Sequence, residues 1–383
     1  MRRSIRLLSS VAAIGLFAIG CAAPAQPAAP TSAPAAGSTA AAAATSVPQA
    51  QAKPTTAPAP TTAPAAASKP TGRLSVYSAL NESTNNAFVD AFKKANPGVE
   101  VDVLPLAAAG ELQTRITTEK ASPKADIFIG GSAEFHDPLG KQGLLEAYKS
   151  PNASSVDPKF KDADGMWTGW YIGIFGLAIN TDRWSKEMAG KPTPSTWDDL
   201  LNTDLKGKLD FPDPVKTGGG YIFLATQVFR FNKDEAKAMD YMKKLNDNIG
   251  QYVGTSPQGI ELVGQGQFLM GPNWGHDILT ASQKGQPLEF KAPADTANEI
   301  GAISIIKGGP NTAAAKAFVD WVLTKEAGQL NVQLSNRLSV RPDVPPAAGA
   351  PTLDTVKLVN YDRDWATANK DRLIKMWQSA VGM

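Results

Sequence analysis

Apolar and polar residues alternate in two different rhythms along most of the chain. The stretch LSVYS at 74–78 is rich in strand-forming residues, and VEVDVLPL at 99–106 alternates apolar and polar side chains with a period of two. Between them, Phe88 and Phe92 recur at helical spacing, and Asn96-Pro97-Gly98 ends that helix. The pattern therefore predicts a strand, a helix and a second strand in succession.

The same succession continues to the C-terminus, without an internal repeat. Further strands are predicted at 125–131, 173–180, 209–214 and 299–307. The segment 267–282 is predicted to begin as a strand and to continue as a helix. Further helices are predicted at 110–122, 135–148, 193–208 (capped near Ser195 or Thr196), 218–231, 233–247, 311–332 and about 365–381. Strands that alternate with helices predict an α/β fold, with a parallel sheet covered on both faces.

The N-terminus differs from this pattern. Arg2 and Arg3 precede an apolar stretch from Leu7 to Ile19, which predicts a secretory signal over residues 1–21 that is too short to span a membrane. Cys21 is the only cysteine, so no intrachain disulfide can form. Ala18-Ile19-Gly20-Cys21 resembles a bacterial lipobox, which implies a lipid on Cys21. The alternative is an ordinary secreted protein that is cut after a nearby alanine.

Residues 22–71 consist mainly of Ala, Pro, Thr and Ser and predict a disordered tether. About 310 residues remain, which is more than one core usually holds and favours two lobes. The whole chain has a formal net charge of +2, but residues 1–71 carry five cations and no acid, which leaves −3 for the folded part. A mildly acidic fold argues against a nucleic-acid partner. No second long apolar run predicts a membrane span.

Small and polar residues follow four of the predicted strands. In open α/β sheets, ligands bind at the carboxyl ends of strands, beside helix N-termini. We therefore expect ligand contacts from Ser78, Ala79, Asn81, Gly131, Ser132, Thr217, Gly218, Gly219, Gly220, Tyr221, Asn273, Trp274 and Asp277. The run KTGGGY favours an anion-binding nest because three glycines precede a helix; a tight turn is the alternative.

Several of these residues have a structural alternative. Ser132 is also a candidate helix cap. Trp274 is either a core residue or an aromatic platform in the site, and Trp170 is equally open between core and site wall. Glu134 and Asp277 are either partners for a ligand amine or solvated acids at helix starts.

Motifs for catalysis are missing from the sequence. The chain has two histidines, and it contains no HExxH, G-x-S-x-G, GxxxxGK[ST] or GxGxxG pattern. We therefore predict a protein that is not an enzyme, with no catalytic residue, no resident metal and no cofactor. A secreted lyase or hydrolase is the alternative in another functional class.

Taken in order, the segments resemble the solute-binding proteins of ABC importers, in the group related to ferric-iron, thiamine and phosphonate binders. The matching stretches are LSVYSALNE, ADIFIGGSAEFHDPLGKQGLLEAY, GIFGLAINTDRW, PSTWDDLLNTDLKGKLDFPDP, TGGGYIFLA, GQFLMGPNWGHDI and IGAISIIKGGPNTAAAKAFVDWVLTKEAGQ. The resemblance implies a two-lobed periplasmic-binding-protein type II fold, with crossing strands at 175–181 and 299–306 and the ligand between the lobes.

The resemblance also implies domain limits and a function. Lobe 1 would hold 73–178 plus about 305–383, with the last helix packed across the back, and lobe 2 would hold 179–304. The protein would be an exported, lipid-anchored monomer at the outer face of the cytoplasmic membrane or in the periplasm. It would capture a small anionic organic solute, a phosphonate or phosphate ester, and deliver it to an ABC permease. A sensor that presents its ligand to a membrane receptor would share this sequence.

The chain departs from the ferric binders of this group. Where they carry a histidine, an acid and a tyrosine pair, this sequence has Asn81, Gly131 and Trp274-Gly275. A ferric ion needs anionic oxygen ligands, and none of these residues offers one. The departure disfavours direct ferric binding. Thiamine or its phosphates stay an alternative because Trp274 offers a surface for a cationic ring.

Overall fold

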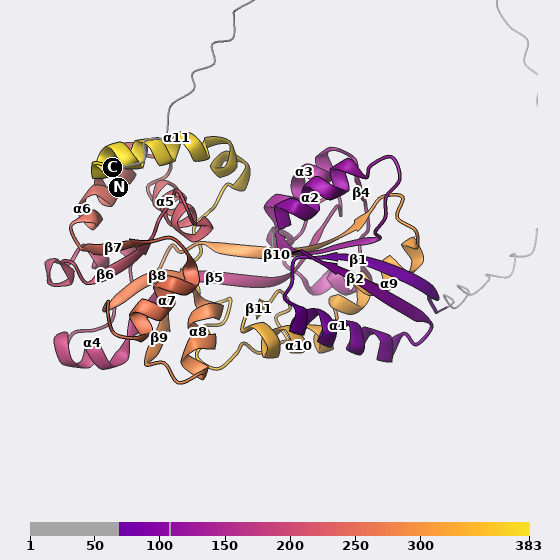
Figure 1. The fold of residues 1–383 in the computed structure, drawn as a ribbon, viewed down its shortest axis with the longest axis horizontal. Coiled ribbons are helices and arrows are strands. Elements are labelled where there is room, and N and C mark those ends of the chain that lie inside the picture. The colour runs from indigo at the N-terminus through magenta and orange to yellow at the C-terminus, as the bar shows by residue number, and fades with distance from the viewer. Residues whose placement is uncertain (1–68, 107–108) are drawn as a thin grey trace, which may run out of the picture. The chain divides into compact units, whose positions relative to one another are not determined.

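The computed structural model describes residues 69–106 and 109–383 (Figure 1). The predicted signal, the lipidation site Cys21 and nearly all of the tether lie outside the described residues. Within those two ranges, no helix combines the length and the apolar character needed to cross a membrane.

The described chain alternates strands and helices, as the pattern predicts. The strands are β1 (Gly72–Ser78), β2 (Val99–Pro105), β3 (Ile127–Ser132), β4 (Leu145–Glu146), β5 (Thr168–Asn180), β6 (Leu209–Pro212), β7 (Ile249–Val253), β8 (Met270–Trp274), β9 (Leu288–Lys291), β10 (Asn298–Ile306) and β11 (Leu338–Ser339). The α-helices are α1 (Glu82–Ala95), α2 (Ala109–Thr118), α3 (Ala133–Lys141), α4 (Thr181–Glu187), α5 (Gly218–Arg230), α6 (Glu235–Asn246), α7 (Ser256–Gly264), α8 (Gly275–Gln283), α9 (Thr312–Val322), α10 (Lys325–Ser335) and α11 (Arg363–Val381).

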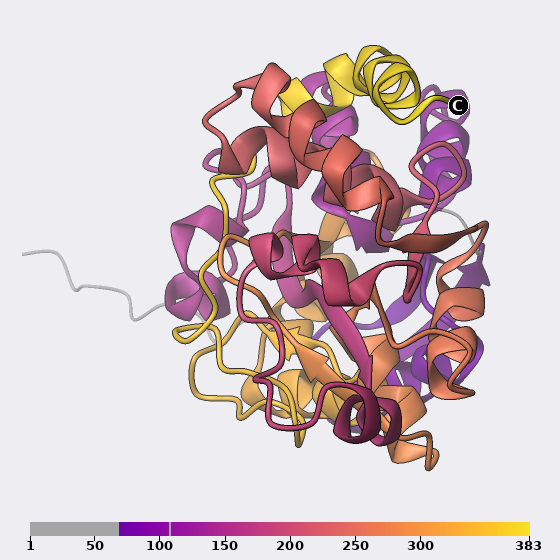
Figure 2. The same ribbon diagram turned by 90° about the vertical axis from the view of Figure 1, so that its left-hand side faces the viewer.

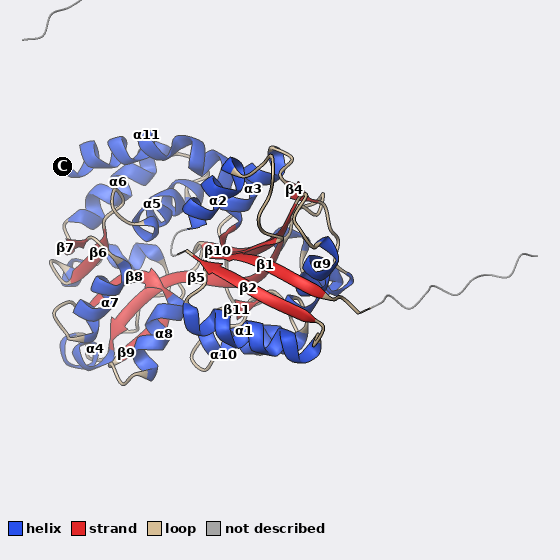
Figure 3. Ribbon diagram, turned by 45° about the vertical axis from the view of Figure 1, so that its right-hand side comes forward, coloured by secondary structure: helices blue, strands red, loops and turns tan. Residues whose placement is uncertain are grey.

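Two long antiparallel strands join two parallel groups of strands. The strand order is β2-β1-β3-β10-β5-β8-β6-β7, in which β1 pairs in parallel with β2 and β3, and β6 pairs in parallel with β7 and β8. The first half of β5 pairs with β10, and its second half pairs with β8 and β9. Strands β5 and β10 are thus the two crossings between the lobes, and helices cover both faces of the sheet (Figure 3).

Aromatic clusters fill the core of each lobe. In the first lobe, the Phe88 ring of α1 lies 5.5 Å from that of Trp321 in α9, and the two rings meet edge to face. In the second lobe, Trp197 and Phe223 meet edge to face at 5.0 Å. Trp170 on β5 is 2% exposed and packs on Phe88, so it is a core residue and not a wall of the site.

Two predicted helices are interrupted in the structure. The segment 311–332 is not one helix but two, because the Thr324 side chain accepts a hydrogen bond from the Ala327 N–H at 3.2 Å and starts α10 anew. The segment 193–208 forms two short 3₁₀ turns rather than an α-helix. The first turn ends at Asn202, whose side chain accepts from the Asp204 N–H and begins the second turn, so a new cap interrupts the segment.

The C-terminal helix α11 lies on the second lobe. Its apolar face packs on α5 and α6, and Leu373 and Trp377 are buried in the core that those helices share (Figures 1 and 2). The resemblance had grouped this helix with lobe 1. Ala366, Leu373 and Trp377 lie on one face of α11 and belong to the same hydrophobic cluster as residues of α5 and α6, which explains where the helix packs.

Candidate functional site

The turn after β1 holds Ser78, Ala79 and Asn81. The Ser78 side chain is buried, and its hydroxyl donates to Asn85 Oδ1 at 2.6 Å. Asn81 Oδ1 accepts from the Thr84 N–H at 2.9 Å and so caps α1. Both polar side chains therefore satisfy groups within their own turn, and the start of α1 already has its cap.

The turn after β3 lies beside the first one, because the Ala79 N–H donates to the Ile129 carbonyl at 2.9 Å. Gly131 has a φ of +73°, and a Cβ at this position would overlap the Cβ of Ala109 at the start of α2. Ser132 precedes α3, yet its hydroxyl makes no hydrogen bond to that helix. The first N–H groups of α3 therefore lack a side-chain cap.

His136 holds this turn in place from inside the lobe. Its ring is fully buried and stacks on Phe128 at 4.0 Å. Burial lowers its pKa from 6.5 to about 3, so the ring is neutral at pH 7. Nε2 lies 3.2 Å from the Gly130 carbonyl, to which it donates, and Nδ1 accepts from the Ser304 hydroxyl at 2.9 Å. The residue is structural.

The glycine run of the second lobe forms the first turn of α5. Thr217 Oγ1 accepts from the Gly220 N–H at 2.9 Å and donates to the Asp213 carbonyl at 3.0 Å, so its only proton is used within the turn. A Cβ at Gly220 would overlap the Pro212 carbonyl, whereas a Cβ at Gly218 would meet no atom within 4 Å. The three glycines have ordinary helical backbone, not an alternating nest conformation.

Tyr221 points away from this turn. Its hydroxyl donates to the Ala366 carbonyl of α11, and its ring is buried in the second-lobe core. Gly219 instead lies against Phe175, since a Cβ there would be 3.2 Å from the Phe175 ring.

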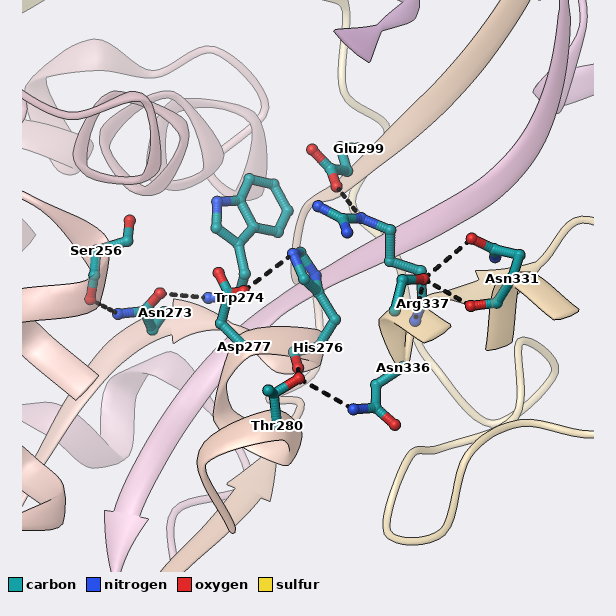
Figure 4. A network of polar contacts seen from close by, with 11 residues as sticks. Ser256, Asn273, Trp274, His276, Asp277, Thr280, Glu299, Asn331, Asn336 and Arg337 are labelled. Carbon is teal, nitrogen blue, oxygen red and sulfur yellow. Dashed lines mark hydrogen bonds and ion pairs between the residues drawn. The ribbon is translucent and has the colours of Figure 1, made fainter. Parts of the chain in front are cut away.

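Asn273 and Trp274 join the starts of two helices, α7 and α8. Asn273 Nδ2 donates to the Ser256 carbonyl at the start of α7, at 2.9 Å, and Asn273 Oδ1 accepts from the Trp274 N–H at 2.8 Å (Figure 4). The Trp274 ring is half-buried and meets Phe175, beside Gly219, edge to face at 5.1 Å. Trp274 also precedes α8 and gives that helix no side-chain cap. The start of α8 therefore resembles that of α3.

A polar cluster lies next to Trp274, for which the sequence predicted Asp277 as a site residue but gave no indication of Glu299 and Arg337. It combines His276 and Asp277 of α8 with Glu299 of β10 and Arg337 before β11 (Figure 4). Arg337 Nε donates to Glu299 Oε1 at 3.1 Å, and its guanidinium lies 4.9 Å from the centre of the Tyr171 ring. In the sequence, the only available signal was a charged residue at the border of an apolar segment, as in NEIGAISII and SNRLSV.

Burial sets the charge states in this cluster. It lowers the pKa of His276 well below its usual range, with a further contribution from Arg337, so the ring is neutral. Its Nδ1 is buried without a hydrogen-bond partner. Burial raises the pKa of Asp277, which the Arg337 charge opposes. The cluster offers carboxylates, a guanidinium and an unused imidazole nitrogen to a polar ligand.

The predicted residues thus form two sets. One set lies on lobe 1 and consists of Ser78, Ala79, Asn81, Gly131 and Ser132; the other lies on lobe 2 and consists of Thr217, Gly218, Gly219, Gly220, Asn273, Trp274 and Asp277. Tyr221 belongs to neither set, because its side chain points away from the glycine turn. No hydrogen bond between described residues joins the two sets directly. They are connected through β10, on which Gly301 pairs with Ser132 and Glu299 belongs to the polar cluster. Among the residues that the structure describes, no group of three or more His, Cys, Asp or Glu side chains is placed to hold a metal ion.

Comparison with known sequences supports a common origin with binding proteins. Residues 87–357 match the family model for bacterial extracellular solute-binding proteins. An uncharacterized protein of Haemophilus influenzae is 32% identical over 324 residues, which cover 81% of this chain and 91% of that protein. A putative 2-aminoethylphosphonate-binding periplasmic protein of Salmonella typhimurium is 25% identical, with 72% of this chain and 80% of that protein covered.

Comparison with solved structures agrees with the sequence matches. The periplasmic binding protein AfuA of Actinobacillus pleuropneumoniae, with exogenous fructose-6-phosphate bound, is 31% identical with a TM-score of 0.65; the match covers 81% of this chain and 99% of AfuA. A Trichodesmium protein in complex with iron and citrate has a TM-score of 0.67 over 81% of this chain and 99% of its own length, at 19% identity. The second likeness shows the fold alone, which is the type II periplasmic-binding-protein fold.

Proposed function

Because the chain belongs to the bacterial extracellular solute-binding proteins, we propose that its solute is a hydroxylated organic phosphate ester, bound between the lobes. The chain is a solute-binding component of an ABC import system and not an enzyme, and the names of its relatives as periplasmic-binding proteins support export. The type of solute is the new part of this proposal.

The observation that carries the proposal is the pair of helix starts without side-chain caps. Helices α3 and α8 begin at the carboxyl ends of β3 and β8, one on each lobe, and neither Ser132 nor Trp274 caps its helix with a side chain. Free N–H groups and the positive end of the helix dipole favour an anionic group at such a start. A ligand anion would replace the missing caps.

The polar cluster beside Trp274 supports a hydroxylated solute. Carboxylates of Asp277 and Glu299 accept hydrogen bonds from hydroxyl groups, and the Arg337 guanidinium donates them. Fructose 6-phosphate combines a phosphate with several hydroxyls, and it is bound to the A. pleuropneumoniae relative at 31% identity.

A second candidate is 2-aminoethylphosphonate, which the Salmonella relative is named for. Its phosphonate suits the same helix starts, and its ammonium group would pair with Asp277 or Glu299. The donor set does not favour ferric ion, because Asn81, Gly131 and Trp274 supply no anionic oxygen and, among the described residues, no three His, Cys, Asp or Glu side chains are placed to hold a metal ion. Thiamine is supported by the half-buried Trp274 ring alone.

Calorimetric titration of the ligand-free protein tests these candidates together. We expect fructose 6-phosphate to bind more tightly than fructose, 2-aminoethylphosphonate, thiamine or ferric citrate. Tighter binding of 2-aminoethylphosphonate would select the second candidate, and binding of ferric citrate or thiamine alone would reject both. Native mass spectrometry of the protein, purified without refolding, would also show the mass of a copurified solute.

We further propose that Cys21 carries a lipid and that residues 22–71 form the tether. The lipobox-like sequence and the Ala/Pro/Thr-rich composition support this proposal. In cells that express the full chain, Cys21→Ala is expected to move the protein from the membrane fraction to the soluble exported fraction. Retention of the variant in the membrane fraction would refute the anchor. We expect a monomer, which the mass of the released protein would check.

A further inference from the structure

The start of α11 touches the first turns of two helices, one on each lobe, that follow predicted site residues. Arg363 Nε lies 3.0 Å from Glu134 Oε1, in the first turn of α3 on lobe 1. Three residues further on, the Ala366 carbonyl accepts a hydrogen bond from Tyr221, in the first turn of α5 on lobe 2. The C-terminal helix therefore spans from one set of predicted site residues to the other.

The Glu134–Arg363 pair is incompletely satisfied. The side chains are 28% and 22% exposed, so water reaches them only in part. Glu134 Oε2 is buried without a hydrogen-bond partner, and the Arg363 Nε–H is not aligned for a hydrogen bond despite the short distance. Burial raises the pKa of the nearby Tyr361, and the charges of Glu134 and Arg363 act on that pKa in opposite directions. Such a buried polar group without a partner needs an explanation.

The charges at the start of α3 supply an explanation for the unpartnered Glu134 oxygen. Glu134 lies two residues after Ser132, at the uncapped helix start where the proposed phosphate would bind, and its carboxylate would repel that phosphate. A guanidinium has five N–H donors in a planar fork that matches phosphate oxygens. Arg363 uses few of them on Glu134 and retains donors for a second anion.

We propose that Arg363 is a solute-binding residue that donates to the anionic group of the solute, and that Glu134 competes with the solute for it. The inference rests on the proposed function. It adds a ligand contact from α11, a helix that the sequence placed at the back of the molecule. Arg363 thereby makes the site selective for anionic solutes over neutral ones.

The competing explanation for the Glu134–Arg363 contact is an ion pair that only holds the two lobes together. A second ion pair between the same helices provides a control for this explanation. Lys141 of α3 and Asp364 of α11 are 2.8 Å apart, between the same two helices, but their side chains are 64% and 73% exposed. This pair has no unsatisfied buried atom and should contribute little. Breaking it removes a contact between α3 and α11 without touching Arg363.

The test compares four variants of the full chain by calorimetric titration with fructose 6-phosphate. For Arg363→Gln we expect about tenfold weaker binding or more, from the loss of one charge-assisted contact. For Glu134→Gln we expect binding tighter by about two- to tenfold, because the competing carboxylate is removed. Lys141→Gln and Asp364→Asn should bind like the natural protein.

The directions of these changes separate the explanations. An ion pair that only holds the two lobes together predicts that Arg363→Gln and Glu134→Gln change affinity in the same direction, and that result would overturn the proposal, as would an unchanged affinity in Arg363→Gln. Thermal unfolding of each variant checks that it is folded. If the natural protein binds neither fructose 6-phosphate nor 2-aminoethylphosphonate, the proposed function itself fails, and the role of Arg363 falls with it.

Discussion

The starts of α1 and α5 carry side-chain caps, whereas the starts of α3 and α8 do not. Asn81 and Thr217 each accept a hydrogen bond from an N–H in the first turn of their own helix. Ser132 and Trp274 occupy the same position before α3 and α8 and accept none. The comparison teaches that a strand end rich in polar residues is not by itself a binding site, because its polar groups can be satisfied locally.

The largest effect is expected where the α3 turn is shaped by its neighbours. In Gly131→Ala, the new Cβ would meet Ala109 at a φ of +73°. Backbone strain and overpacking together are expected to lower the free energy of unfolding by about 3 kcal/mol. Urea unfolding of the variant would measure this loss.

Gly143→Ala is the matched control, because Gly143 has a φ of +70° and no atom within 4 Å of a Cβ. Backbone strain alone should cost about 1 to 2 kcal/mol there. Equal losses in the two variants would show that the contact with α2 does not shape this turn.

The second-largest effect is a pH dependence of the free energy of unfolding that comes from His136, which holds the same turn. The pKa of His136 is about 3 in the folded chain and about 6.5 when unfolded, so the unfolded chain binds the proton first as the pH falls. The free energy of unfolding should therefore decrease between pH 6.5 and 3, by at most about 1.4 kcal/mol per pH unit. Above pH 6.5 this residue adds no pH dependence.

His136→Gln should remove that slope. We expect urea unfolding at pH 7, 5.5 and 4.5 to show the variant less stable at pH 7, with the difference from the natural protein shrinking at lower pH. A constant difference over this range would mean that the ring does not stay neutral in the folded chain.

The smallest effect is expected from removing the side chain before a capped helix, α5, and before an uncapped helix, α3. Thr217→Ala removes the cap of α5 and is expected to lower the free energy of unfolding by about 1 kcal/mol. Ser132→Ala removes no such bond and should change it by less than about 0.5 kcal/mol. In calorimetry with fructose 6-phosphate, we expect Ser132→Ala to bind about two- to tenfold more weakly. If Ser132→Ala lowered stability and left the affinity unchanged, Ser132 would act as a structural residue like Thr217 and not as a ligand contact.

The sequence predicted most of the fold because apolar spacing, caps and glycines act locally. Phe88 and Phe92 placed α1, and Asn96-Pro97-Gly98 ended it where the structure does. The same locality explains the misses. Thr324 lies within a strong helical pattern, but its backbone is extended, and its hydroxyl accepts from the Ala327 N–H and donates to the Trp321 carbonyl, which divides α9 from α10.

The site was less predictable because its members meet only after folding. Asn81, Ser132 and Thr217 look alike as cap residues, and only the structure distinguishes the side-chain oxygens that accept a cap hydrogen bond from the one that does not. Glu299 lies on β10 and Arg337 just before β11, and the pairing of both strands with β5 brings the two residues together. Their sequence separation gave no signal of this contact.

Amide chemical shifts of the isotopically labelled protein test the central claim most directly, because they report where the solute anion binds. Fructose 6-phosphate and fructose would be compared as ligands. The account predicts that fructose 6-phosphate shifts the N–H resonances at the starts of α3 and α8, from Ala133 and from Gly275 onward, and that fructose does so much less. Equal shifts with both ligands, or phosphate-dependent shifts confined to Gly218–Gly220, would contradict it.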